Sequence, residues 1–191
     1  MSATLQVGIL GAGSCDFPQL RTKSSFCLRD VRSVEDLEGI QLLLIGHVTN
    51  VSAFLQFLRR SQLDAGIAQY VGKGLHVMAM GHGAAALAEA IVDLDCVQGN
   101  EPGLGLLPLV ALRSREETCA ISTINLPDWP KHCFISEILP CFQWARPTLQ
   151  SYRLFARTDL QAAISVRISE DGFWAMSEVR NVLVTSLFAH G

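Results

Sequence analysis

Short apolar runs alternate in the first half of the chain with segments whose apolar residues recur at helical spacing. In Val51–Arg60 the apolar residues stand at positions 51, 54, 55 and 58, which predicts a helix with one buried face. A second helix is expected over about Leu63–Val71, ended by Gly72 and Gly74. Ser33–Gly39 is polar and predicts a short helix or a loop. The predicted strands are Leu5–Leu10, Phe26–Val31, Gln41–Ile45 and His76–Met80, and Gly83–Val92 is expected to form the next helix. This alternation predicts a mostly parallel sheet covered on both faces.

The apolar pattern changes in the second half of the chain. Four runs predict strands without long helices between them, and Val179–His190 is expected to close the chain as an apolar helix. The four predicted strands are Leu104–Arg113, Thr118–Thr123, Ala162–Ile168 and Phe173–Ser177. Because there is no internal repeat and no low-complexity linker, residues 1–191 are predicted to form one domain.

Composition narrows the class of protein. Apolar residues make up 49% of the 191 residues and charged residues only 17%, which favours a compact domain over disorder and suggests a face kept for a protein partner. The net charge of −3, with no basic cluster longer than Arg59-Arg60, argues against nucleic acid and anionic membranes as partners. The six cysteines include no CxxC pair and are expected to be reduced and mostly buried, as in a cytoplasmic protein. We see no signal peptide, and Leu75–Val92 is too polar for a membrane span.

Several segments, in order, carry a resemblance to a known family. Val77–Gly99, VMAMGHGAAALAEAIVDLDCVQG, is similar to the family pattern VxGICGGxQMLGxxIxDPxGVEG, and GLGLLP follows at positions 103–108. Asp30–Leu37 is similar to VRSPEDL, and Leu43–Asn50 stands where the family has ILPGSKNT. The chain thus resembles class I glutamine amidotransferases, in particular the glutaminase domain of cobyric acid synthase. The resemblance implies a flavodoxin-like fold, a three-layer α/β/α sandwich with a mostly parallel central sheet.

The resemblance also implies that the catalytic residues are missing. The family's cysteine sits on a sharp strand-to-helix turn, the nucleophile elbow, which here is Gly81, His82 and Gly83. The loop that would form the oxyanion hole contains Gly46 and His47. No histidine stands at the position of the family's base, near Val179, although the acidic Glu178 remains close by. Without a thiolate and an imidazole there is no nucleophile–base pair, so glutaminase activity is not expected.

Three functions remain open from the sequence. The first is a non-catalytic, amidotransferase-like pseudoenzyme that binds a synthase-type partner, or a second copy of itself, as a structural or regulatory subunit. The second is an active enzyme that uses unconventional residues, either a residual glutaminase or a hydrolase built on His47 and His82. Among the cysteines, Cys15 is the candidate for a substitute nucleophile. The third is a small-ligand sensor that uses the old pocket, where the turn at Gly81–Gly83 would offer amide groups to an anion.

No cofactor and no resident metal are expected. His47 and His82 lie on the two loops that frame the family's oxyanion hole, so they could share a ligand or a metal ion; the alternative is that both are hydrogen-bonded to backbone or water. Gly11-Ala12-Gly13 follows a predicted strand but lacks the third glycine of a dinucleotide-binding loop. His132, Cys133 and Cys141 do not complete a four-ligand set.

Overall fold

The computed structural model describes residues 4–11, 20, 23–46, 48–96 and 99–113, together with the backbone of six later strands. Those later strands are β8 (Gln143–Ala145), β9 (Tyr152–Ala156), β10 (Val166–Ile168), β11 (Trp174–Ser177), β12 (Val182–Thr185) and β13 (Phe188–His190). The predicted strand Thr118–Thr123 lies outside the described residues. None of the described helices has the length and apolar character needed to cross a membrane.

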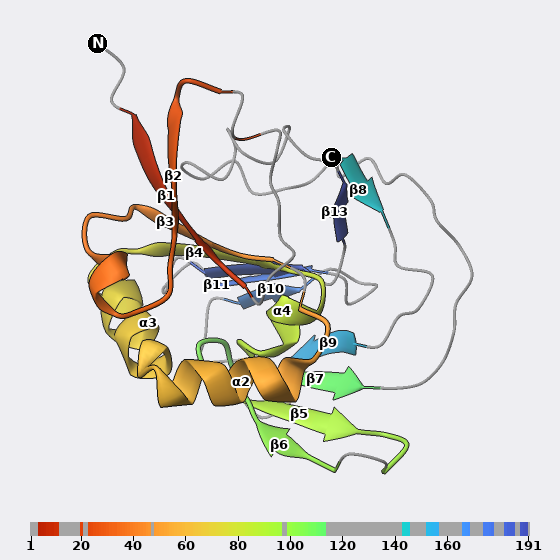
Figure 1. Cartoon of the computed structure of the whole chain (residues 1–191). Coiled ribbons are helices and arrows are strands. Elements are labelled where there is room, and N and C mark those ends of the chain that lie inside the picture. The colour runs from red at the N-terminus through yellow and green to blue at the C-terminus, as the bar shows by residue number, and fades with distance from the viewer. Residues whose placement is uncertain are drawn as a thin grey trace.

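A seven-stranded sheet forms the centre of the fold (Figure 1). Its strand order is β10-β11-β12-β4-β3-β1-β2, where β1 is Leu5–Leu10, β2 Phe26–Asp30, β3 Leu42–Ile45 and β4 His76–Met80. The five strands β2, β1, β3, β4 and β12 are parallel to one another. β11 is antiparallel to both of its neighbours, β12 and β10. The mostly parallel sheet predicted from the alternating pattern is confirmed, and all four early strands lie where they were expected.

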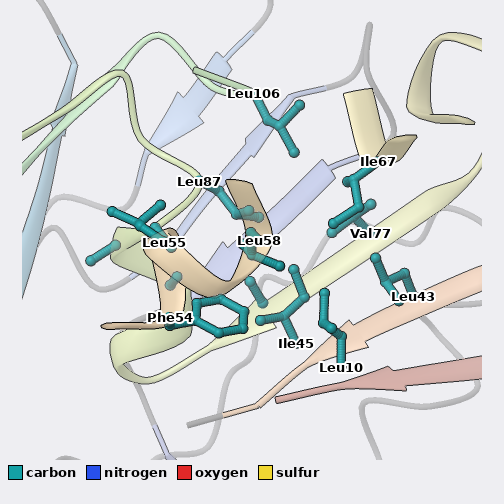
Figure 2. Packing of buried hydrophobic residues seen from close by; sticks show 14 of the residues in the cluster. Leu10, Leu43, Ile45, Phe54, Leu55, Leu58, Ile67, Val77, Leu87 and Leu106 are labelled. Carbon is teal, nitrogen blue, oxygen red and sulfur yellow. The ribbon is translucent and has the colours of Figure 1, made fainter. Parts of the chain in front are cut away.

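Two helices pack on this sheet. The predicted helices are confirmed as α2 (Val51–Arg60) and α3 (Leu63–Gly72), while the polar segment before them contains only a short 3-10 helix, η1 (Glu35–Leu37). The Asn50 side chain accepts a hydrogen bond from the amide of Ala53 at 2.9 Å, which caps α2. Figure 2 shows Phe54 and Leu58 of α2 among the side chains of the strands, and both are fully buried. The periodic apolar face of α2 is therefore the face that meets the sheet.

The long helix expected over Gly83–Val92 is wrong. The helix α4 covers only His82–Ala85, and Ala90–Asp93 forms the strand β5. The carbonyls that would continue the helix bind the following loop instead. Ala86 accepts a hydrogen bond from the amide of Leu104 at 2.8 Å, and Ala88 accepts one from Gly105 at 2.9 Å. The GLGLLP loop thus replaces the hydrogen bonds of further helical turns and ends α4 after one turn.

β5 begins a second, four-stranded sheet of order β6-β5-β7-β9, which lies beside α2 and α4 (Figure 1). In it, β6 is Glu101–Pro102 and β7 is Leu109–Arg113. The predicted strand Leu104–Arg113 is therefore confirmed only in its second half, because its first half is the loop that binds the carbonyls after α4.

The expected closing helix over Val179–His190 is also wrong. This segment contains β12 and β13, and β12 lies between β11 and β4 in the central sheet. β12 is rich in β-branched residues (Val182, Val184 and Thr185), which favour strands, and hydrogen-bonded neighbours lie on both of its sides. The other predicted strands of this half are confirmed in shortened form, as β10 and β11.

Candidate functional site

The turn between β4 and α4, where the resemblance places the elbow, has an unusual backbone conformation. Gly81 has φ 56° and ψ −136°, a combination that residues with a Cβ rarely adopt. The residue is buried, at the carboxyl end of a strand in the interior of the sheet. The sharp turn predicted at this position is therefore present, and the residue at its apex has no side chain.

Gly83 brings the elbow into contact with the loop after β3. A Cβ on Gly83 would lie 2.2 Å from the carbonyl oxygen of Gly46 and 3.0 Å from Cγ2 of Ile45. The first distance is far below any van der Waals contact, so only glycine allows this approach. The two loops that frame the predicted site therefore pack directly against each other.

His82 makes a second link between the same two loops. Its Nδ1 lies 3.2 Å from the backbone carbonyl oxygen of Val48. A carbonyl can only accept a hydrogen bond, so Nδ1 carries the proton in this contact. Burial lowers the pKa of His82 below its usual value, and the Val48 carbonyl opposes this shift in part, so the neutral ring is favoured near pH 7.

The amide of Gly46 is engaged inside the sheet. It donates a hydrogen bond to the carbonyl oxygen of Leu10 in β1 at 3.4 Å, while the carbonyl of Gly46 faces Gly83. The group that the resemblance assigns to an oxyanion hole is thus bound to the neighbouring strand.

The two predicted histidines are only partly described. His82 bonds to backbone, whereas His47 lies outside the described residues, so their shared ligand stays a hypothesis. In the described ranges no group of three or more His, Cys, Asp or Glu residues is placed to hold a metal ion. Ala12, Gly13, Cys15, His132, Cys133 and Cys141 also lie outside these ranges.

The residual acid Glu178 lies outside the described residues. The pairing of β11, β12 and β4 shows at which end of the sheet β11 ends. β11 ends at Ser177, which pairs with Val182, and Val182 pairs with Val77 near the start of β4. The end of β11 is therefore about 13 Å along the strand from Gly81 of the elbow.

The strand end beside the elbow is that of β12, since Thr185 pairs with Met80. The next histidine along the chain is His190 in β13. Sequence reasoning missed it as a candidate base because Val179–His190 was expected to be a helix. The β-branched run before it is the signal that would have placed it after a strand.

Sequence reasoning also missed a buried polar cluster in the second sheet. Arg113 of β7 lies with Nη2 3.2 Å from Oδ2 of Asp93 in β5, and with Nη1 3.6 Å from Oε1 of Glu101 in β6. The same Nη2 donates to the carbonyl of Gly99 at 3.0 Å. Asp93 and Arg113 are buried, so each charge depends on these partners.

Asp93 also shapes the turn that follows β5. Its carboxylate accepts hydrogen bonds from the amides of Asp95 at 3.2 Å and Gly99 at 3.0 Å, and its own amide donates to the Asn100 side chain at 2.9 Å. A single buried carboxylate therefore holds both sides of this turn. The signal in the sequence was a charged residue at the end of each of two apolar strands.

The cluster reaches the helix that begins next to the elbow. The Ser52 hydroxyl in the first turn of α2 donates to Glu101 Oε1 at 2.5 Å, and Arg59 donates to the carbonyl of Pro102 at 2.6 Å. These contacts fix the second sheet against α2.

The expectation that the cysteines are mostly buried is wrong for the two that are described. Cys27 and Cys96 are free and exposed. Cys27 lies on β2, at the edge of the sheet, and Cys96 lies in the turn after β5 with φ 56°. Both lie in segments that the apolar core does not cover.

Comparison with known proteins gives partial matches in sequence and a match in fold. No family model matches the chain. The chain is 35% identical over 103 residues to a cobyric acid synthase of Variovorax paradoxus, which is 54% of this chain and 22% of that protein. It is 38% identical over 95 residues to the cobyric acid synthase of an Acidovorax species, 50% of this chain and 19% of that protein. The chain spans about a fifth of the length of these curated relatives.

The fold has a counterpart among solved structures. A crystal structure of a glutamine amidotransferase matches with a TM-score of 0.63 at 19% identity, over 95% of this chain and 88% of that chain. The parallel sheet, its strand order and the helices on it are thus those of a flavodoxin-like α/β fold. The chain therefore shares its fold with this glutamine amidotransferase and is similar in sequence, over half its length, to part of cobyric acid synthases.

Proposed function

We propose that this chain is a non-catalytic glutamine amidotransferase-like domain that acts as a structural or regulatory subunit. The observation that carries this proposal is Gly81, a residue without a side chain at the apex of an elbow with φ 56° and ψ −136°. Release of ammonia from glutamine on such a turn requires a nucleophile there and a base to activate it. The turn supplies neither a thiol nor a hydroxyl.

The backbone gives a physical reason for glycine at this position. A residue with a Cβ in this conformation costs about 1–3 kcal/mol, which an enzyme tolerates because the strained turn presents its nucleophile. Without catalysis that strain has no use, and glycine removes it. Replacement of a nucleophile by Gly81 therefore suits a domain retained for its fold.

The relatives suggest the kind of partner. The chain matches about a fifth of each cobyric acid synthase, so a synthase-type polypeptide is the first partner to test. A second copy of the chain is the other arrangement. The net charge of −3 supports a protein partner over nucleic acid.

Ammonia release from glutamine tests the loss of catalysis. The purified chain is assayed alone and mixed with a cobyric acid synthase whose own glutaminase has been inactivated. We expect no ammonia above the level of a heat-denatured sample in either case. Glutamine-dependent release that persists through purification would overturn the proposal. Gel filtration of the same mixture tests the partner, and we expect a complex that elutes ahead of either protein.

An active glutaminase with unconventional residues is the second candidate. The observation that favours it is the end of β12 beside the elbow, because His190 follows in the next strand. If ammonia is released, His190→Ala and Cys15→Ala separate the possible base from the possible nucleophile. Loss of activity in both variants would support this candidate.

A further inference from the structure

The loop between β3 and α2 is attached at every residue that the structure describes in it except Thr49. Here the β3–α2 loop means Gly46 and residues 48–50. Gly46 bonds to β1 and packs on Gly83, the Val48 carbonyl bonds to His82, and Asn50 caps α2. The attachments at both ends belong to the sheet and the helix. The middle of the loop is held by the bond from His82 and by the side chain of Val48, which packs in the hydrophobic core.

This loop lies against the elbow. Gly81, Gly83, Gly46 and Val48 are all buried, and Val48 is only 1% exposed. A molecule that approaches the elbow from the side of the loop must therefore displace the loop. The contact between Nδ1 of His82 and the Val48 carbonyl is a side-chain hydrogen bond from the elbow itself to this loop.

We infer that the hydrogen bond between His82 and the Val48 carbonyl holds the β3–α2 loop against the elbow. The buried turn at Gly81–Gly83 then becomes accessible only when that bond breaks. The contact is autoinhibitory in this sense, because the Gly46 carbonyl lies against Gly83 and the Val48 carbonyl binds the side chain of His82. His82 is a positioning residue and not a ligand in this arrangement. The inference does not depend on the proposed function, since a closed loop is compatible with an inactive or an active domain.

Two substitutions separate the hydrogen bond from the shape of the side chain. Asparagine carries an amide nitrogen at the δ position, as His82 carries Nδ1, so His82→Asn keeps a donor for the Val48 carbonyl. Leucine places a methyl group at that position, so His82→Leu keeps bulk and loses the donor. His76→Leu, at the other end of β4, is the matched control for loss of an imidazole.

Hydrogen exchange of a peptide that covers residues 46–53 measures opening of the loop. We expect about tenfold faster exchange in His82→Leu, and rates close to those of the parent chain in His82→Asn and His76→Leu. Peptides from α3 should exchange at the same rate in all four proteins, which shows that the opening is local.

Three results would overturn the inference. Unchanged exchange of residues 46–53 in His82→Leu would show that the bond does not hold the loop. Equal acceleration in the leucine and asparagine variants would show that the ring, not the donor, is what matters. If His82→Leu and a second donor-free variant, His82→Ala, both unfold while His82→Asn folds, the bond stabilises the whole domain rather than the loop. The glutaminase assay is unaffected by any of these results, so the two proposals fail separately.

Discussion

Single glycines at the elbow serve different purposes, and substitution separates them. At Gly81 the backbone conformation makes a Cβ costly, whereas at Gly83 the neighbouring carbonyl leaves no room for one. The first restriction concerns torsion angles and the second concerns space. The resemblance placed Gly81 at the position of the family's cysteine and aligned Gly83 with a family glycine, and the coordinates show what restricts each residue.

Gly83→Ala should be strongly destabilising. The added methyl group meets the Gly46 carbonyl at 2.2 Å, and backbone cannot move aside as a flexible side chain does. We expect a loss of about 3 kcal/mol in the free energy of unfolding, measured by urea titration. The control is Gly72→Ala, an exposed site at the end of α3 with no atom within 4 Å of the new Cβ. It should be neutral or stabilising by about 0.5 kcal/mol. Similar losses in both variants would contradict the assigned contact.

The imidazole of His82 predicts a pH dependence of stability. Burial lowers its pKa in the folded chain below the ordinary 6.5, so the unfolded chain binds a proton more readily in mild acid. The contribution of His82 is therefore fully present above pH 6.5 and is lost as the pH falls below that value. His76 is shifted in the same direction by burial.

We expect the urea midpoint of the parent chain to fall between about pH 7.5 and 5.5, and to fall less in His82→Asn, which has no group titrating at that position. The carboxylates of Glu35 and Asp36, whose pKa values are lowered by hydrogen bonds, lose their charge below this range. An equal fall in parent and variant would show that His82 does not contribute.

Among the elements, the second sheet depends on charges that are almost removed from solvent. Asp93 and Arg113 come from β5 and β7, and Glu101 comes from β6 between them in the sequence. Loss of one member leaves another charge buried, which costs more than the ion pair itself contributes.

Asp93→Ala is therefore expected to lower the free energy of unfolding by about 3 kcal/mol, near the lower end for buried pairs because Glu101 stays within reach of Arg113. The matched control is Arg32→Ala, which breaks the exposed pair with Asp30 at 3.4 Å. That change should cost less than about 1 kcal/mol. Thermal or urea unfolding of both variants provides the comparison, and equal effects would mean that the buried cluster is replaceable by water.

The spacing of apolar residues predicted the helices, whose hydrogen bonds join residues close in sequence. It also predicted the strands that are short apolar runs with polar or glycine residues at their ends. Leu5–Leu10, Val51–Arg60 and His76–Met80 have the bounds that the sequence predicted. The helix after the elbow was overestimated because its later carbonyls bind Leu104 and Gly105. Apolar spacing does not reveal that competition. The polar cluster was missed for the same reason, since its members come from three strands.

For the molecule as a whole, the pairing of β4 with β12 joins the late strands of the chain to the early strands in one sheet. Val77 and Val182 lie in register although about a hundred residues separate them in sequence. This long separation explains why Val179–His190 was expected to be a helix: its partners are too distant for a local pattern to indicate. The elbow was predictable from the resemblance, whereas the strand beside it was not.

Truncation tests the importance of this pairing. A chain that ends at Ser177 loses β12 and exposes the edge of β4, so we expect it to be insoluble or to lack a cooperative thermal transition. A chain that ends at Leu187 keeps β12 and loses β13, whose partner is β8 in a separate two-stranded sheet. It should remain soluble and melt cooperatively. A soluble, cooperative chain ending at Ser177 would contradict the role given to β12.

The late position of β12 in the sequence bears on how the protein is made in the cell. During synthesis β3 and β4 emerge early, and the amides and carbonyls along one side of β4 have no partner strand until β12 has been translated. Throughout that interval the nascent chain carries an open edge next to Gly81. A chaperone, or a companion polypeptide translated nearby, can therefore pair with β4 beside Gly81 before β12 does.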